Sequence, residues 1–364
     1  MIPLTSPLAS YESARSDIDA VIARVLSSGT YILGPEVKAL EVEFAQFIGV
    51  EHAVAVANGT DAVALALRAL GVGPGDEVIT VSHTAVATVS AIEQMGATPV
   101  LADVEPGYHT LDFDQVRKLS NDATAAVVVV HLYGQAADMG NALAYRASTG
   151  VPIIEDCAQA HGARWNGMRL GSIGDVGAFS CYPTKNLGAI GDAGLITTRS
   201  TQIADRLRGL RQYGWKDRNV SLEAGVNSRM DELQAGILRV QLARLDIQNG
   251  FRAAIAERYA EQLAGFPIRT PLTRAESSHV FHLFVCEVAE RESFREHLRA
   301  QGVDTAIHYP IPVHLQPAYA GRIRHGRMKV TDGLMGTIVS LPMYPELSFT
   351  NVDCVIEAIK SYYA

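Results

Sequence analysis

One lysine is unusual because of its surroundings. Lys185 lies in the stretch FSCYPTKNLGAIGDAG, residues 179–194, where small and apolar residues surround it and three glycines follow it. The ordinary interpretation is a lysine that extends out of a loop and keeps its ammonium in water. In apolar and tightly turned surroundings, however, the ammonium form is disfavoured, and the neutral amine is available as a nucleophile. Lys185 is therefore a candidate catalytic residue.

Two adjacent acids follow an apolar run. Glu155 and Asp156 come directly after VPII, residues 151–154. A carboxylate at the end of a buried strand is costly to desolvate unless it has a partner. One interpretation is that Asp156 pairs with a cation held above the end of the strand. The alternative is that one acid caps a helix while the other is solvated.

A third candidate is the segment Asn58-Gly59-Thr60-Asp61, which lies between a predicted strand and a predicted helix. Gly59 lets the backbone approach a ligand, and the free amides of a helix start can receive a phosphate. An ordinary helix cap by Thr60 or Asp61 is the alternative. No G-x-x-x-x-G-K-[ST] motif is present, and the first strand–helix turn lacks G-x-G-x-x-G. A nucleoside triphosphate or a dinucleotide is therefore not indicated.

Short apolar segments alternate with helical patterns up to about residue 200. Segments 53–57, 77–81, 98–103, 125–134, 151–158, 176–181 and 193–198 are predicted strands, and 37–49 and 61–71 are predicted helices that end in glycine. Several strands are apolar throughout, as expected when both faces are covered. This alternation predicts an α/β fold with a mainly parallel sheet. Long helices and then a shorter α+β pattern follow from about residue 230.

Composition excludes several classes of protein. The 364 residues are 48% hydrophobic, enough for a large core, and the net charge of −8 provides no basic surface for nucleic acid or an anionic membrane. The longest aliphatic run, VVVV at 127–130, is too short to span a bilayer. The four cysteines lack C-x-x-C spacing, which argues against a zinc site and a disulfide framework. The N-terminal residues lack a secretory signal, so we expect a cytoplasmic protein.

The three candidates together indicate one cofactor. A phosphate cradle, a buried acid and an apolar lysine, in that order on an α/β sheet, are the parts that hold pyridoxal phosphate. The phosphate requires the helix start, the pyridinium nitrogen a carboxylate and the aldehyde an amine.

Six segments carry a resemblance to a known family. They are GTYILGPEVKALEVEFAQFIG (29–49), VANGTDAVALALRALGVGPGDEVIT (56–80), VPIIEDCAQAHGA (151–163), FSCYPTKNLGAIGDAGLITT (179–198), GVNSRMDELQAGIL (225–238) and HYPIPVHLQPAY (308–319). In this order they resemble the sugar aminotransferases of the DegT/StrS type, pyridoxal-phosphate enzymes of the aspartate-aminotransferase fold. The resemblance implies a large domain, residues 1–245, with a mainly parallel seven-stranded sheet. A smaller C-terminal α+β domain, residues 246–364, is expected to follow, and the N-terminal segment is expected to pack on it.

The resemblance also implies roles for individual residues around the cofactor. Lys185 would bind the aldehyde, Asp156 would face the pyridine nitrogen, and Gln159 would reach the ring hydroxyl. The phosphate would be held by Gly59, Thr60 and Ser180, together with Asn227 of a neighbouring subunit. The site would therefore lie across a homodimer interface. His83 falls where the family stacks a flat side chain on the ring, although a structural histidine is the alternative.

The substrates are implied in the same way. In this family the amino donor is usually glutamate, and the acceptor is a nucleotide-linked keto-deoxyhexose. The pattern YPTKNLGA, residues 182–189, resembles relatives that aminate C3 of 3-keto-6-deoxyhexoses, with thymidine diphosphate as the expected carrier. Tyr182, Tyr309 and His314 are candidates for the sugar pocket, and packing explains them equally well.

Three other interpretations are open from the sequence. Relatives that act on 4-keto sugars typically carry a threonine-rich segment after the lysine, which is missing here. Relatives that dehydrate keto sugars lack the lysine itself. A cofactor-binding regulator without turnover is disfavoured because Lys185, Asp156, Gln159 and Asn227 are all present.

Overall fold

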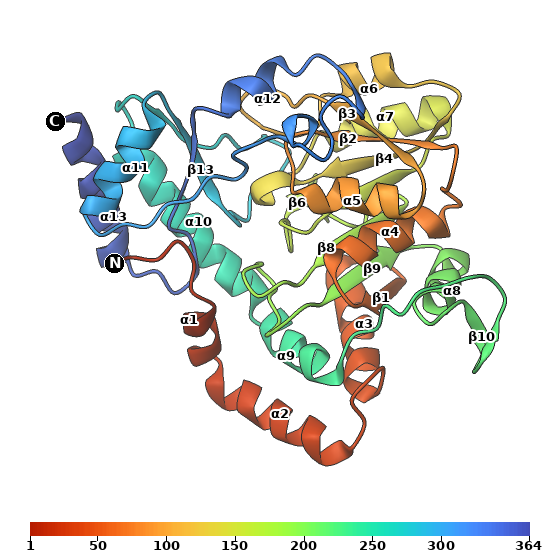
Figure 1. Cartoon of the computed structure of the whole chain (residues 1–364). Helices are drawn as coiled ribbons and strands as arrows, with labels where there is room; N and C mark the ends of the chain where they lie inside the picture. Colours follow the sequence, from red (N-terminus) through yellow and green to blue (C-terminus); the bar gives the residue numbers. More distant parts are fainter.

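The computed structural model describes residues 1–364, and its centre is one large sheet (Figure 1). The strand order is β1-β9-β8-β5-β4-β2-β3-β14. These strands are β1 (His52–Val56), β2 (Glu77–Val81), β3 (Thr98–Ala102), β4 (Thr124–Val130), β5 (Ile153–Asp156), β8 (Val176–Ser180), β9 (Gly194–Thr198) and β14 (Arg324–His325). Only β9 runs antiparallel to its neighbours. The predicted fold class is confirmed, but the sheet has eight strands instead of seven, because β14 pairs with β3.

Helices cover both faces of this sheet. One face packs against α3 (Pro35–Ile48), α6 (Phe113–Leu119), α7 (Met139–Thr149) and α9 (Glu232–Leu242), and the other against α4 (Gly59–Ala69), α5 (Val86–Gln94) and α8 (Thr201–Leu210). Along β4, Val127 and Val129 join the first core, whereas Ala126 and Val128 join the second. Successive side chains alternate between the faces, so a strand covered on both sides is apolar throughout.

A second, smaller sheet lies in the C-terminal part of the chain. It contains β12 (Ile268–Arg269), β13 (Phe284–Val288) and β15 (Ile338–Leu341), and it shares a separate core with α10 (Leu245–Gln262), α11 (Arg291–Ala300) and α13 (Phe349–Tyr363). Near the N-terminus, Ile2 pairs with Val303 and contacts this core. Within the same stretch, η2 (Val313–Leu315), β14 and α12 (Lys329–Leu334) lie beside the large sheet. A domain boundary at residue 245 stays a prediction.

The remaining elements are short or peripheral. They are α1 (Pro7–Glu12), α2 (Arg15–Ser28), η1 (Leu132–Gly134), β6 (Arg164–Trp165), β7 (Met168–Arg169), β10 (Trp215–Asp217) and β11 (Val220–Ser221). The hairpin of β10 and β11 protrudes from the body, and α2 forms the lower edge of the view in Figure 1. None of the helices combines the length and the apolar character that a membrane span requires.

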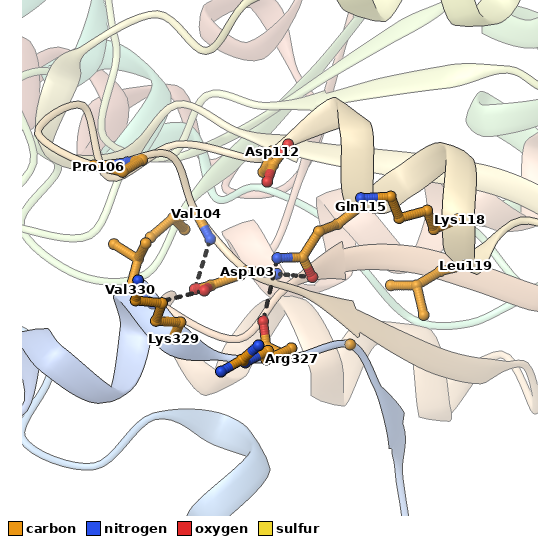
Figure 2. Close-up of a pocket in the computed structure, with 11 residues that line it drawn as sticks. Asp103, Val104, Pro106, Asp112, Gln115, Lys118, Leu119, Arg327, Lys329 and Val330 are labelled. Carbon is orange, nitrogen blue, oxygen red and sulfur yellow. Dashed lines mark hydrogen bonds between the residues drawn. The ribbon is translucent and has the colours of Figure 1, made fainter.

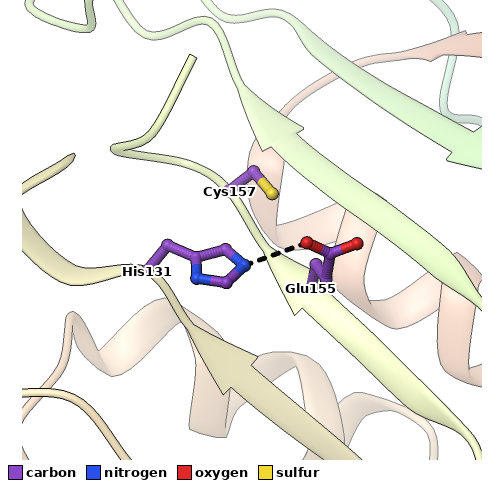
Figure 3. A group of neighbouring side chains, drawn as sticks. All are labelled: His131, Glu155 and Cys157. Atoms are coloured by element: carbon purple, nitrogen blue, oxygen red, sulfur yellow. Dashed lines mark hydrogen bonds and ion pairs between the residues drawn. The ribbon is translucent and has the colours of Figure 1, made fainter. Parts of the chain in front are cut away.

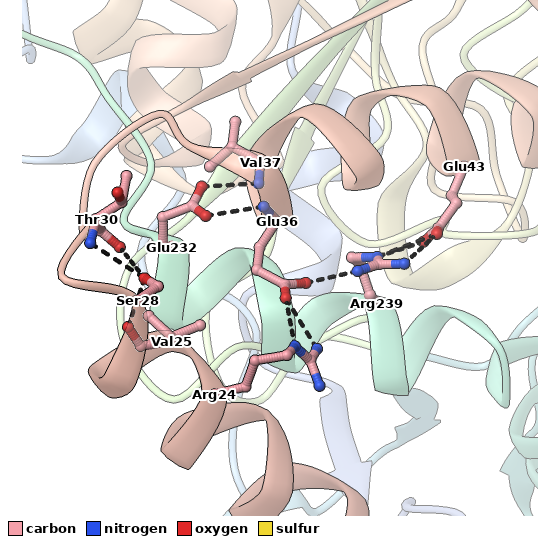
Figure 4. Close-up of polar contacts among 9 residues, drawn as sticks. All are labelled: Arg24, Val25, Ser28, Thr30, Glu36, Val37, Glu43, Glu232 and Arg239. Carbon is pink, nitrogen blue, oxygen red and sulfur yellow. Dashed lines mark hydrogen bonds and ion pairs between the residues drawn. The ribbon is translucent and has the colours of Figure 1, made fainter.

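The start of α3 is fixed by a buried carboxylate from α9 (Figure 4). Glu232 accepts hydrogen bonds from the backbone N–H groups of Gly34, Glu36 and Val37 at 2.7, 2.8 and 2.9 Å. The first N–H groups of a helix have no intrahelical partner, so this carboxylate caps them. Arg239, also on α9, binds Glu36 at 2.6 Å. These contacts hold the GPEV turn, residues 34–37, against α9.

Candidate active site

The predicted cofactor residues lie at one edge of the large sheet. Strands β1, β2, β4, β5 and β8 all run in the same direction, because β9 is antiparallel to both β1 and β8. Their carboxyl ends therefore share an edge, which is where open α/β sheets bind ligands. The structure brings to this edge Gly59, Thr60, His83, Asp156, Gln159 and Ser180.

Lys185 lies in the turn that follows β8. Its backbone N–H donates to the carbonyl of Tyr182 at 2.8 Å, which closes the turn. Burial lowers the pKa of the Lys185 amine from 10.5 to about 8, and the nearby Asp156 and Cys181 oppose this shift. A larger fraction of the amine is therefore neutral near physiological pH than for an exposed lysine, and a neutral amine is a nucleophile and a base.

Asp156 is a buried carboxylate that accepts fewer hydrogen bonds than its two oxygens allow. Its Oδ2 accepts a hydrogen bond from Thr88 Oγ1 at 2.8 Å, and its Oδ1 accepts one from the backbone N–H of Ala158 at 3.1 Å. A carboxylate offers about four lone-pair positions. Asp156 is only 6% exposed, so its remaining capacity faces the protein interior instead of bulk water. It can accept a further hydrogen bond from a protonated group.

The start of α4 lies directly against Ser180. A Cβ atom at Gly59 would lie 2.4 Å from the Cβ of Ser180, so a side chain cannot fit there. The Asn58 side chain caps the N–H of Asp61 at 2.8 Å. The N–H groups of Gly59 and Thr60, in the first turn, have no acceptor within the helix. A helix start with free amides and a neighbouring hydroxyl suits a phosphate.

The acid next to Asp156 has a different environment (Figure 3). Glu155, His131 and Cys157 are fully buried and place one potential metal ligand each within 4.8 Å of the others. The Nδ1 atom of His131 accepts the N–H of Ala137 at 3.0 Å, so Nε2 carries the proton and donates to Glu155 at 3.1 Å. Burial raises the pKa of the Cys157 thiol well above its usual value. Neither side chain is prepared to bind a cation.

Backbone groups occupy the rest of the Glu155 carboxylate. Its oxygens accept the N–H groups of Gly171, Ile173 and Gly174 at 2.9, 2.8 and 2.7 Å. With His131, four donors use the four lone-pair positions, and together they keep the pKa of Glu155 lowered although burial opposes this. The group is a structural anchor between β5 and the loop before β8.

The loop after β4 supplies a residue that the sequence analysis missed. Strand β4 ends at Val130, so the predicted strand 125–134 is too long: Tyr133 and Gly134 have left-handed backbones with φ of 61° and 102°. The Tyr133 hydroxyl lies 2.7 Å from Nε2 of His83. Its backbone N–H donates to Gln159 at 2.6 Å. The sequence signal was the position of HLYG, residues 131–134, directly after the apolar run of β4, just as Glu155 and Asp156 come directly after the apolar VPII.

The predicted substrate residues have different environments. Tyr309 accepts a hydrogen bond from Gln159 Nε2 at 3.0 Å, and burial raises its pKa to about 12. Tyr182 is 52% exposed and lies two residues after Ser180. The ring nitrogens of His314 are already engaged, one with Ser82 at 2.7 Å and the other with Asp332 at 3.1 Å. Asn227 is exposed. The roles of these residues stay predictions.

A separate cavity of about 480 Å³ lies at the β3 edge (Figure 2). None of the predicted site residues lines it. Asp103 on its wall accepts the N–H groups of Val330 and Thr331 at 2.7 and 2.8 Å and the Thr331 hydroxyl at 2.6 Å. This carboxylate therefore joins α12 to the large sheet.

Comparisons with known proteins agree along the whole chain. A model of the DegT/DnrJ/EryC1/StrS aminotransferase family matches residues 12–360. A dTDP-3-amino-3,4,6-trideoxy-alpha-D-glucose transaminase of Streptomyces venezuelae is 45% identical over 363 residues, which cover 99% of this chain and 96% of that protein. A dTDP-3-amino-3,6-dideoxy-alpha-D-galactopyranose transaminase of Aneurinibacillus thermoaerophilus is 45% identical over 350 residues, with 96% of each chain covered.

Solved structures have the same fold. The crystal structure of DesV from S. venezuelae, in complex with a ketimine intermediate, matches with a TM-score of 0.97 and 45% identity over 99% of this chain and 98% of that chain. NtdA from Bacillus subtilis, with the bound cofactor PMP, matches with a TM-score of 0.89 and 29% identity over 96% and 82% of the two chains.

Proposed function

Because the chain belongs to the DegT/DnrJ/EryC1/StrS aminotransferase family, it is a pyridoxal-phosphate-dependent enzyme, and we propose that it transfers an amino group from glutamate to C3 of a keto-deoxyhexose linked to thymidine diphosphate. One observation carries the proposal. This chain is 45% identical over almost its full length to a dTDP-3-amino sugar transaminase. In it, the pKa of Lys185 is lowered, and the nearby carboxylate of Asp156 accepts only two hydrogen bonds from the protein.

Three features of this chain fit pyridoxal phosphate. Because Gly59 has no side chain, Ser180 lies directly against the start of α4, and the free amides of Gly59 and Thr60 with this neighbouring hydroxyl suit a phosphate. Asp156 retains capacity for a hydrogen bond from a protonated ring nitrogen. Lys185 offers an amine whose neutral form is favoured by burial. These are the three contacts that the cofactor requires.

When bound, pyridoxal phosphate supplies an aldehyde that takes up the amino group and an electron-withdrawing ring that weakens the adjacent C–H bond. The carboxylate of Asp156 would keep a proton on the ring nitrogen of the bound cofactor, because a neighbouring negative charge stabilises that cation in a site with little water. Thr88 and the N–H of Ala158 hold the carboxylate in place.

Lys185 moves the proton in this reaction. With the cofactor bound, the Nζ atom of Lys185 would take the proton from the α-carbon of the donor, and in the reverse direction it would supply a proton to the reacting carbon of the sugar. A base is most effective when its pKa lies near the working pH, and burial lowers the pKa of Lys185 to about 8. The amine is thus able both to accept and to release a proton.

The choice of C3 rests on the residues that flank Lys185. Residues next to the reacting amine determine which carbonyl of the sugar reaches attack distance. The stretch Tyr182–Ala189 surrounds the lysine, and Tyr182 is exposed, so its side chain is accessible to a ligand. The two relatives whose names state a 3-amino sugar support the same carbon.

The homodimer is part of the same proposal. Asn227 is exposed on its own subunit and is free to reach the cofactor phosphate of a second copy. Mixing Lys185→Ala with Asn227→Ala subunits then forms hybrid dimers that hold one intact site. We expect partial recovery of activity on mixing, whereas a fully active monomer on sizing would contradict shared sites.

The function is tested by running the reaction in reverse. The purified enzyme is given 2-oxoglutarate with either a dTDP-linked 3-amino or a dTDP-linked 4-amino deoxyhexose, and glutamate formation is measured. We expect glutamate from the 3-amino compound alone. Glutamate only from the 4-amino compound would overturn the choice of C3, and none from either would overturn the proposed substrate class. A Lys185→Ala sample is the control for background.

A further inference from the structure

A closed ring of hydrogen bonds joins three segments of the chain beside the site. The Tyr133 N–H donates to Gln159 Oε1 at 2.6 Å, and Gln159 Nε2 donates to the Tyr309 hydroxyl at 3.0 Å. His308, which precedes Tyr309, accepts the hydroxyl of Tyr133 through its carbonyl oxygen. Tyr133 thus closes the ring at both ends and also contacts His83. We propose that Tyr133 is a positioning residue that orients both Gln159 and His83 toward the cofactor.

The orientation of the Gln159 amide follows from its two partners. A backbone N–H only donates, so the atom of Gln159 that faces Tyr133 is the carbonyl oxygen. The NH₂ group then faces Tyr309 and uses one hydrogen there. Its second hydrogen remains available to a further acceptor. Tyr133 therefore makes Gln159 a donor at the site, which suits the hydroxyl oxygen of the cofactor ring and rests on the proposed function.

The position of the His83 proton follows from the same hydroxyl. A carbonyl oxygen only accepts, so the single hydrogen of the Tyr133 hydroxyl is donated to His308. The contact with His83 at 2.7 Å then requires that the imidazole Nε2 carries the hydrogen. Burial, together with His109, lowers the pKa of His83 to about 3, so the ring is neutral and its Nδ1 has no proton. His83 is therefore in its neutral Nε2–H tautomer.

The backbone of Tyr133 shows that this placement is costly. Its φ of 61° and ψ of 0° are left-handed, a conformation that bulky residues rarely adopt. Such outliers persist where the surrounding structure holds them, often at functional sites. In this conformation the N–H meets Gln159 while the side chain reaches His83, with the two rings nearly perpendicular at 82° and 5.9 Å between centroids. A purely structural tyrosine requires neither contact.

The direct test is the position of the His83 proton. Ring-¹⁵N-labelled histidine reports by NMR which nitrogen is protonated, and the His83→Gln variant assigns the signal. We expect Nε2–H in the wild type, and a shift toward the Nδ1–H tautomer in Tyr133→Phe, which keeps the ring and the backbone N–H. Tyr145→Phe is the matched control, because it removes another buried hydroxyl, bonded to Ser120 at 2.7 Å. A proton on Nδ1 in the wild type, or an unchanged tautomer in Tyr133→Phe, would overturn the proposal.

A binding measurement gives the second readout. Affinity for pyridoxamine phosphate is measured for the same proteins and for His83→Gln and His83→Asn. Tyr133→Phe should bind about tenfold more weakly, because the His83 imidazole loses the hydrogen bond that holds its ring in one orientation. His83→Gln places an amide nitrogen near the Nε2 position and should lose less affinity than His83→Asn, which places it near Nδ1. Equal losses in these two variants would contradict the assigned tautomer. The tautomer result needs no cofactor, so failure of the wild type to bind it would overturn only the proposed function.

Discussion

Two carboxylates that are adjacent in the sequence differ in how many hydrogen bonds they accept in the structure. Glu155 accepts four hydrogen bonds, from His131 and three backbone N–H groups, and it anchors the loop before β8. Asp156 accepts only two, from Thr88 and Ala158, and lies close enough to Lys185 to affect its pKa. Both residues are buried. The number of hydrogen-bond positions left unfilled, and not burial alone, separates the structural acid from the acid that can bind a ligand.

The largest effect on activity is expected at Asp156. Asp156→Asn removes the charge that stabilises a protonated ring nitrogen and should lower kcat by about a thousandfold. Its fold should persist, since the amide oxygen still accepts a hydrogen bond. Steady-state kinetics with cofactor in excess gives the value. An Asp156→Asn variant with normal kcat would remove the distinction between the two acids.

The matching change at Glu155 should affect stability instead. Glu155→Gln replaces an acceptor by an NH₂ group among four donors, so buried N–H groups lose their partners. We expect a loss of about 3 kcal/mol in the free energy of unfolding. Urea unfolding monitored by circular dichroism measures it, and kcat of the folded fraction should change much less than in Asp156→Asn. Wild-type stability in this variant would show that Glu155 is not an anchor.

An effect of similar size on stability is expected from the charge of Lys185. Its pKa is lowered from 10.5 to about 8, so between these values the unfolded chain binds more protons than the folded one. The folded protein therefore pays a penalty for the buried ammonium below pH 8, and stability recovers as the pH rises toward 10.5. Without cofactor, Lys185→Met should be more stable than the wild type by about 3 kcal/mol at pH 7. Unfolding at pH 7 and pH 9.5 should show this advantage shrinking; a constant difference would contradict the lowered pKa.

Metal removal should have the smallest effect. The ligand atoms of Glu155 and His131 are already used by protein donors and acceptors, so a divalent cation would have to displace them. Adding a chelator, or excess Zn²⁺, should leave the melting temperature unchanged. A marked fall with the chelator would show that the cluster in Figure 3 binds a metal.

The sequence predicted the elements of the large sheet because their apolar patterns are local. Segment 77–81 coincides with β2, and Gly49 ends α3 in a left-handed conformation as its pattern indicates. The eighth strand, β14, has two residues and depends on a partner more than 200 residues away, so no pattern marks it. The fold class was predictable, whereas this edge was not.

The candidate site was predictable only in part, for the same reason. Lys185 and Asp156 stand out by their neighbours in the sequence. Tyr133 does not, because its role depends on contacts with His83 and Gln159, which lie on other loops. For the two acids after VPII, the sequence left open whether Asp156 pairs with a cation or one acid caps a helix while the other is solvated. The donors that surround Glu155, from His131 and the loop 171–174, are contacts between distant segments that no local pattern shows.

The most direct test of this account is to locate the lysine that binds the cofactor. The holoenzyme is reduced with borohydride, digested and analysed by mass spectrometry. The account predicts that the reduced cofactor is attached to Lys185, that the visible absorption band is lost on reduction, and that Lys185→Ala carries no label. A label on another lysine would contradict the assignment of this site. So would a visible absorption band that persists after borohydride treatment while Lys185 stays unmodified.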